Sequence, residues 1–167
     1  MLNPIFLTNK RKNNRLMKPK SFFLFISTLL IFSFAGCKEN NYEDWKIVND
    51  QWMLKHQSDS GFVVTSSGLC YQIIHQSVGR KPNASSWITA NYKGYLIDGT
   101  LIEKGTYDYY LSSSISGWQE GITKMRDGST FIFYIPSSLA YGKDGSGSKI
   151  PPYSALIYEV TLVSSYY

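Results

Sequence analysis

From residue 62 onward, hydrophobic and polar positions alternate in several short runs, which is the pattern of strands with one buried face. The clearest run lies near the C-terminus, where every second residue from 156 to 162 is apolar. Another run is followed by Asp98-Gly99, a dipeptide typical of hairpin turns. The expected strands cover residues 62–65, 69–75, 87–96, 106–111, 130–135 and 155–163.

One stretch, residues 114–125, departs from this alternation. Trp118, Ile122 and Met125 are spaced as on one face of a short helix. Ser116 is followed three residues later by Gln119, a capping-box pattern that predicts a helix beginning at Ser116. A single short helix among strands predicts an α+β fold, in which an antiparallel sheet half-wraps the helix. We expect Trp118 to point into the concavity of that sheet.

A second helix is predicted over residues 42–56, where Trp45, Val48 and Trp52 would share one face and Asn41 would cap the start. The sequence leaves open whether this helix is a spacer from a membrane or a lid packed on the domain. A long loop, residues 136–154, separates the last two strands and is rich in glycine. A loop of this length in a compact domain is usually functional.

The N-terminal segment has the features of an export signal. Residues 1–36 hold six basic residues and no acidic one, and the apolar run 22–32 is too short to cross a bilayer. We expect translation to begin at Met17, which is followed by Lys-Pro-Lys, and not at Met1. Residues 34–37 (FAGC) resemble the lipobox of bacterial lipoproteins, which implies cleavage before Cys37 and lipidation of that cysteine; the alternative is an ordinary secretory signal with an incidental cysteine. We therefore expect a lipid-anchored envelope protein, at the outer membrane on its periplasmic face or at the surface.

The charge balance changes after this segment. From Cys37 onward the chain carries eleven Lys and Arg against twelve Asp and Glu, so nothing favours binding to nucleic acid. Cys70, the other cysteine, has no partner if Cys37 is acylated, and we expect it to be a small buried strand residue. The predicted organisation is a signal peptide (1–36), a lipidated tether and helix (37–61) and a globular domain (62–167).

Four segments, in this order, are similar to FKBP-type peptidyl-prolyl isomerases. They are residues 91–99 (NYKGYLIDG), 117–121 (GWQEG), 135–142 (IPSSLAYG) and 150–158 (IPPYSALIY). The resemblance covers about residues 65–162, and the family fold agrees with the α+β arrangement predicted above. It implies a peptidyl-prolyl cis-trans isomerase that acts on proline-containing segments of exported proteins.

The resemblance also implies a pocket for the substrate proline ring, with Trp118 at its bottom. Tyr92 and Tyr158 would form walls, Tyr107 a third wall, and Ile150 would cover one side. The residues expected to hold substrate carbonyls are Ile115, through its backbone N–H, and Tyr141, through its hydroxyl.

Three positions depart from the family pattern. The Phe-Asp pair after the hairpin turn is replaced by Ile102-Glu103, the phenylalanine of the last strand by Tyr158, and a hydrophobic residue before the helix by Ser114. Glu103 either orients a substrate or Tyr141, or is a solvated carboxylate at a strand end.

Isomerisation of an X–Pro bond makes and breaks no covalent bond, so no nucleophile, metal or cofactor is expected. His56 and His75 have no Cys or acidic partner at metal-ligand spacing. Two other functions remain open. The same pocket in a non-catalytic chaperone would hold proline-containing segments, and a structural subunit of an envelope complex would dock through residues 42–56.

Overall fold

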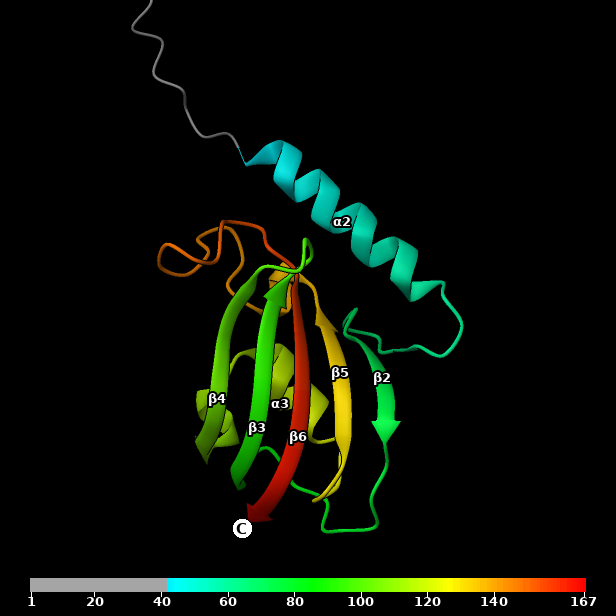
Figure 1. Cartoon of the computed structure of the whole chain (residues 1–167), viewed down its shortest axis with the longest axis vertical. Helices are drawn as coiled ribbons and strands as arrows, with labels where there is room; N and C mark the ends of the chain where they lie inside the picture. Colours follow the sequence, from blue (N-terminus) through cyan, green and yellow to red (C-terminus); the bar gives the residue numbers. More distant parts are fainter. Residues whose placement is uncertain (1–41) are drawn as a thin grey trace, which may run out of the picture. The chain divides into compact units, whose positions relative to one another are not determined.

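The computed structural model describes residues 42–167, so the predicted leader, the lipobox and Cys37 lie outside the described residues. The described residues belong to one compact unit, Asn40–Tyr167. Six strands form a single antiparallel sheet in the order β1-β2-β5-β6-β3-β4, with α3 against one face (Figure 1). The elements are α2 (Glu43–Gln57), β1 (Val63–Val64), β2 (Cys70–His75), β3 (Trp87–Leu96), β4 (Leu101–Tyr110), η2 (Leu111–Ser113), α3 (Ser116–Ile122), β5 (Thr130–Ile135), η3 (Ser137–Leu139) and β6 (Leu156–Tyr166). The predicted α+β fold, a sheet half-wrapped around one short helix with a second helix before it, is confirmed.

The predicted strand boundaries hold for β3 and β5, differ by one residue at β1 and β2, and fail at β4 and β6. β4 begins at Leu101, five residues before the predicted start, and β6 continues to Tyr166. Neither extension has an alternating pattern of its own. Both are held by β3, which pairs with β4 on one side and β6 on the other along its whole length.

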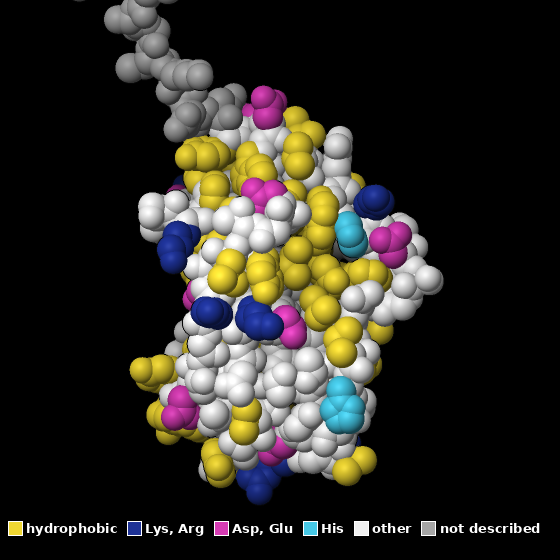
Figure 2. All heavy atoms as spheres, viewed as in Figure 1, with side chains coloured by type: hydrophobic (Ala, Val, Ile, Leu, Met, Phe, Trp, Pro, Cys, Tyr) yellow, Lys and Arg dark blue, Asp and Glu magenta, His cyan; other side chains and the backbone are white. Residues whose placement is uncertain are grey.

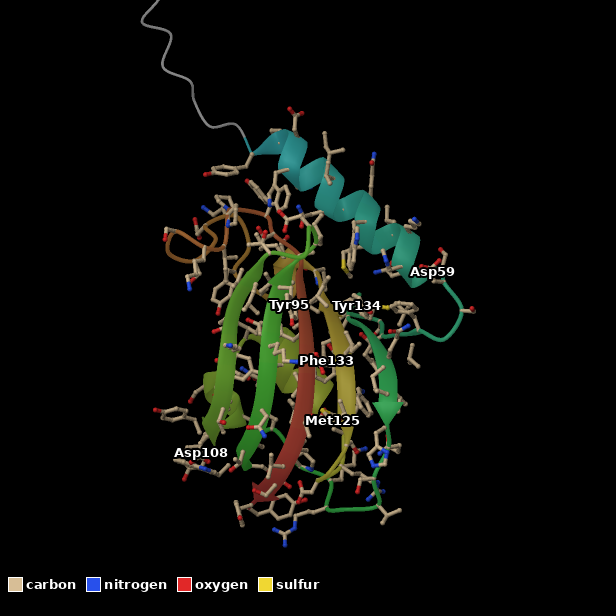
Figure 3. The ribbon with its side chains drawn as sticks, in the orientation of Figure 1. Asp59, Tyr95, Asp108, Met125, Phe133 and Tyr134 are labelled. Atoms are coloured by element: carbon tan, nitrogen blue, oxygen red, sulfur yellow. The ribbon has the colours of Figure 1, made fainter. Side chains whose placement is uncertain are left out.

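The stripe predicted on α3 is confirmed, since Trp118 and Ile122 of α3 and Met125 just after it are all buried against the sheet. Phe133 of β5 lies in this core, and Figure 3 labels it together with Met125. Gly121 explains the close approach of helix and strand, because a Cβ there would lie 2.6 Å from the Phe133 ring.

The predicted capping box is wrong, although the helix does begin at Ser116. The N-cap residue is Ile115, and no side chain caps the helix. The Gln119 side chain instead reaches the residues before the helix, where its Nε2 donates to the carbonyls of Ser112 and Ser114 at 3.2 and 2.7 Å. Gln119 therefore fixes the turn before the helix and does not cap the helix itself.

The α2 helix packs on the domain, across one end of the sheet (Figure 1). Trp45 Nε1 donates to Ser154 Oγ at 2.9 Å, and the buried Asn49 Oδ1 accepts from the Ala155 backbone N–H at 2.8 Å. Val48, predicted on the packed face, is half exposed; Asn49 occupies that face instead.

The C-terminal half of α2 adds an aromatic contact. The His56 ring stacks on Trp52 with 3.9 Å between centroids, and both lie against Tyr134 of β5, which Figure 3 labels below the helix. Figure 2 shows hydrophobic side chains gathered over α2 and the end of the sheet beneath it. Within residues 42–167, no helix is long and apolar enough to cross a bilayer.

Candidate active site

A cavity of about 240 Å³ opens on the concave face of the sheet, at the N-terminal end of α3. Its walls come from β3, β4, β6, the turn before α3 and the long loop after β5. The lining residues are Tyr92, Glu103, Tyr107, Ser113, Ser114, Ile115, Trp118, Tyr141 and Tyr158. Seven of these nine are residues that the sequence predicts for the site.

Trp118 is the centre of an aromatic cluster. The rings of Tyr92 and Tyr158 stand almost perpendicular to it, with centroids 5.2 and 5.4 Å away, and the Tyr107 ring lies at 5.4 Å. Trp118 is only 4% exposed, so one edge of the indole is buried in the core while the ring closes the cavity. Such edge-to-face packing is favourable between aromatic rings and leaves a rigid, largely apolar surface.

Glu103 brings a carboxylate to this aromatic surface. The Tyr158 hydroxyl donates to Glu103 Oε1, and the Tyr92 hydroxyl donates to Oε2 at 3.3 Å. Strand register explains the meeting, because Glu103 of β4 and Tyr158 of β6 both lie opposite Gly94 of β3. The missing side chain at Gly94 leaves the space that the Tyr158 ring occupies.

The tyrosines of the cavity are held in their protonated form. Burial raises the pKa of Tyr158, and the hydrogen bond to Glu103 raises it further. Burial and then the Glu103 charge likewise raise the pKa of Tyr92 and of Tyr141. These phenols therefore remain hydrogen-bond donors at every physiological pH.

Two donors at the cavity are unused. Among residues 42–167, neither the Ile115 backbone N–H nor the Tyr141 hydroxyl has a hydrogen-bond partner. The Trp118 Nε1 is buried and also unpaired within the described part of the chain. Because polar groups are normally paired, the first two donors are available to the carbonyl groups of a bound chain.

Two predicted residues lie beside the cavity, not in its lining. Ile102 and Ile150 are buried and line an adjoining hollow of about 390 Å³, together with Lys149. Glu103 and Tyr141 line both spaces and so form the boundary between them.

Two lining residues, Ser113 and Ser114, are not in the predicted site. They belong to the turn formed by η2 and the residue after it, a run of serines without a hydrophobic pattern. The signals in the sequence are their position directly before the start of α3 and, for Ser114, the replacement of a hydrophobic residue of the family pattern. The described residues contain no group of three His, Cys, Asp or Glu side chains placed to hold a metal ion.

The sequence profile of the family described as FKBP-type peptidyl-prolyl cis-trans isomerase matches residues 78–163, just over half of the chain. The chain belongs to this family, as its four segments predict.

Relatives and solved structures agree with this assignment. A probable FKBP-type peptidyl-prolyl cis-trans isomerase FkpA of Neisseria meningitidis is 37% identical over 119 residues, which cover 68% of this chain and 44% of that protein. The outer membrane protein MIP of Legionella longbeachae is 36% identical over 127 residues, covering 73% of this chain and 54% of that one. The crystal structure of FkpA from Escherichia coli has a TM-score of 0.72 at 28% identity, covering 90% of this chain and 74% of the other.

A second solved structure, a peptidyl-prolyl cis-trans isomerase from Pseudomonas syringae, has a TM-score of 0.71 at 27% identity and covers 75% of this chain and 96% of that one. The chain spans about half the length of the curated relatives it matches.

Proposed function

We propose that this protein is a peptidyl-prolyl cis-trans isomerase that assists the folding of exported or envelope proteins. The observation that carries the proposal is the cavity itself. A rigid aromatic surface around Trp118 lies beside two unused donors, the Ile115 N–H and the Tyr141 hydroxyl. Membership of the family and the names of the relatives support the same activity.

The chemistry needs only such a cavity. An X–Pro amide isomerises over a barrier of roughly 18–20 kcal/mol, and a thousandfold acceleration requires lowering it by about 4 kcal/mol. The planar amide is the more dipolar state, and rotation about the C–N bond removes its resonance. An apolar aromatic cavity that excludes water therefore disfavours the planar form relative to the twisted one.

The named side chains would divide this work. The proline ring would rest on Trp118 between Tyr92 and Tyr107, with Tyr158 behind. The Ile115 N–H and Tyr141 hydroxyl would hold carbonyl oxygens of the bound segment, so that this part of the chain stays fixed while the part beyond the X–Pro bond turns. Ile102 and Ile150 would contact residues next to the proline from the adjoining hollow.

Lipidation at Cys37 would hold the protein at the outer membrane, where folding exported chains pass. The relative named as an outer membrane protein supports an envelope location. One acyl chain alone binds a membrane only marginally, so a stable anchor would carry two or more.

A non-catalytic chaperone that holds proline-containing segments is the alternative, favoured by the departures from the family pattern at Ile102, Glu103 and Tyr158. If the protein is instead a structural subunit that docks to an envelope complex through residues 42–56, only the outer side of α2 is available for the contact, because Trp45 and Asn49 are engaged with the domain. Ile47, Val48 and Leu54 are the exposed apolar residues on that side.

An isomerisation assay decides between enzyme and chaperone. The full-length protein, kept in detergent micelles, would be compared with Trp118→Ala and Tyr141→Phe on a proline-containing peptide. Tyr166→Phe is the matched control, because Tyr166 is exposed at the end of β6 and is not in the lining of the cavity. Circular dichroism would verify that each variant is folded.

Catalysis by the wild type and by Tyr166→Phe, with a loss of about tenfold or more in Trp118→Ala and Tyr141→Phe, supports the enzyme and the site. A folded wild type that does not exceed the uncatalysed rate would overturn the enzymatic proposal. Binding of the same peptide by calorimetry would then support the chaperone.

A further inference from the structure

The lining of the cavity contains one charge. Of the nine lining residues, all within the described part of the chain, Glu103 is the one with an ionisable acidic or basic side chain other than the tyrosine phenols. Its two hydrogen-bond donors, the hydroxyls of Tyr92 and Tyr158, are neutral. They orient the carboxylate and leave its negative charge uncompensated.

Two nearby lysines, Lys149 and Lys93, contact other groups. Within residues 42–167, Glu103 forms no ion pair. Lys149, in the adjoining hollow, is exposed and donates through Nζ to the Ile102 carbonyl at 3.2 Å. Lys93 is paired with Glu159, 3.5 Å away on the outer face of the sheet.

Partial burial strengthens the attraction between Glu103 and a cation, because less water lies between the charges. A cationic group that reaches Glu103 at the edge of the cavity therefore meets an oriented carboxylate, with no cation of the protein in the lining.

We propose that the site selects proline-containing segments in which the residue next to the proline is lysine or arginine. This inference rests on the proposed function, since it assumes that the proline ring occupies the aromatic cavity. With the ring against Trp118, a long cationic side chain from an adjacent residue reaches Glu103 at the boundary of the cavity and the hollow. An acidic residue in the same place meets the like charge of Glu103 and is disfavoured.

The test compares peptides that differ only in charge. One series would be Ala-Xaa-Pro-Phe-Ala and a second Ala-Leu-Pro-Xaa-Ala, each with lysine, glutamate or norleucine at Xaa. Norleucine keeps the aliphatic length of lysine without its ammonium group. For the full-length protein in detergent, isomerisation rates by exchange NMR and affinities by calorimetry would be measured at about 20 mM and about 500 mM salt, which differ in screening length.

We expect kcat/KM for lysine to exceed that for norleucine by about fivefold or more in at least one series, with glutamate lowest. High salt should reduce the ratio of kcat/KM for lysine to kcat/KM for norleucine. In Glu103→Gln the ratio of lysine to glutamate should fall close to one, whatever the absolute rates of that variant are. Glu159→Gln makes the same change of net charge on the outer face. Its ratio of kcat/KM for lysine to kcat/KM for glutamate should equal that of the wild type.

Each other outcome counts against the proposal. Equal rates for lysine and norleucine in both series, with active turnover, would overturn the charge preference and leave the isomerase intact. An equal loss of the ratio in Glu159→Gln would show that net charge, not Glu103, sets it. If no peptide is isomerised, the proposed function fails, and the calorimetric affinities of the same peptides still decide the charge preference.

Discussion

Tyr158 and Glu103 face each other across Gly94: one lies on each strand beside β3, and the Tyr158 hydroxyl donates to Glu103 Oε1. Both residues depart from the family pattern, and in the sequence they are 55 positions apart. In the structure they form one unit. The hydroxyl that Tyr158 adds does not project freely into the cavity, because the Glu103 carboxylate accepts its hydrogen bond.

Tyr158→Phe should therefore destabilise the protein. The phenylalanine fills the same space, but it leaves Glu103 Oε1 without its donor. A hydrogen bond to a charged group contributes about 1.5–3 kcal/mol, and we expect the free energy of unfolding to fall by an amount in this range. Urea denaturation followed by fluorescence measures it.

The background Glu103→Ala provides the control for this prediction. There the Tyr158 hydroxyl is buried without its partner, so Tyr158→Phe should cost little or even stabilise the fold. An equal loss in both backgrounds would show that the hydroxyl stabilises the protein through some other contact.

Gly94→Ala should disturb the site through the Tyr158 ring. A Cβ at Gly94 would lie 2.6 Å from Tyr158 Cε1, so the ring must move toward the cavity. We expect a loss of about 1–3 kcal/mol in unfolding free energy, as for an overpacked core, together with weaker peptide binding.

Gly105→Ala is the matched control for Gly94→Ala, since Gly105 lies on the neighbouring strand opposite Tyr92. A Cβ there would have Tyr92 Oη as its nearest neighbour, at an ordinary 3.9 Å. Its unfolding free energy should stay within about 0.5 kcal/mol of the wild type. Equal effects of the two substitutions would refute the argument from close approach.

Asn49→Ala should loosen α2 from the domain. Asn49 Oδ1 accepts the buried backbone N–H of Ala155, which would be left unpaired at a cost of about 1–3 kcal/mol. Gln51→Ala changes an exposed residue on the same helix and should cost less than about 0.5 kcal/mol. Thermal and urea unfolding would compare the two. An Asn49→Ala variant as stable as the wild type would mean that this hydrogen bond does not hold α2 on the domain.

The sequence predicts the fold wherever a pattern is local. The alternation in β3 and β5 gave their bounds, and the spacing of Trp118, Ile122 and Met125 gave the buried face of α3. The first half of β4, from Leu101, has no such pattern. It is a strand because β3 offers it a partner, and pairing with a distant strand leaves no trace in local periodicity.

The same limit applies to the site. The resemblance to the family predicts the aromatic residues around Trp118, but the contact between Glu103 and Tyr158 depends on the register of three strands. For a similar reason, the sequence leaves open whether α2 packs on the domain. Its polar contact, Asn49 to the backbone of Ala155, involves a residue type that a search for hydrophobic faces passes over.

The two cysteines allow a direct test of the lipid anchor. Cys70 is fully buried in β2, as predicted, and burial raises the pKa of its thiol from 9.0 to about 11. In the folded protein Cys70 should therefore react very slowly with a thiol reagent at pH 8, because little thiolate forms and the sulfur is covered. Because the folded-state pKa is the higher one, this thiol's contribution to stability is present below pH 9 and is lost as the pH rises through about 11.

Counting thiols in the unfolded protein then reports on Cys37. Protein isolated from membranes and unfolded in guanidinium chloride should show one reactive thiol, that of Cys70, because an acylated Cys37 cannot react. The variant Cys70→Ser should show none. Two reactive thiols in the wild type, or one in Cys70→Ser, would mean that Cys37 is free and that the predicted lipidation is wrong. Rapid labelling of the native protein at Cys70 would instead contradict its burial, so the native and unfolded measurements test separate claims.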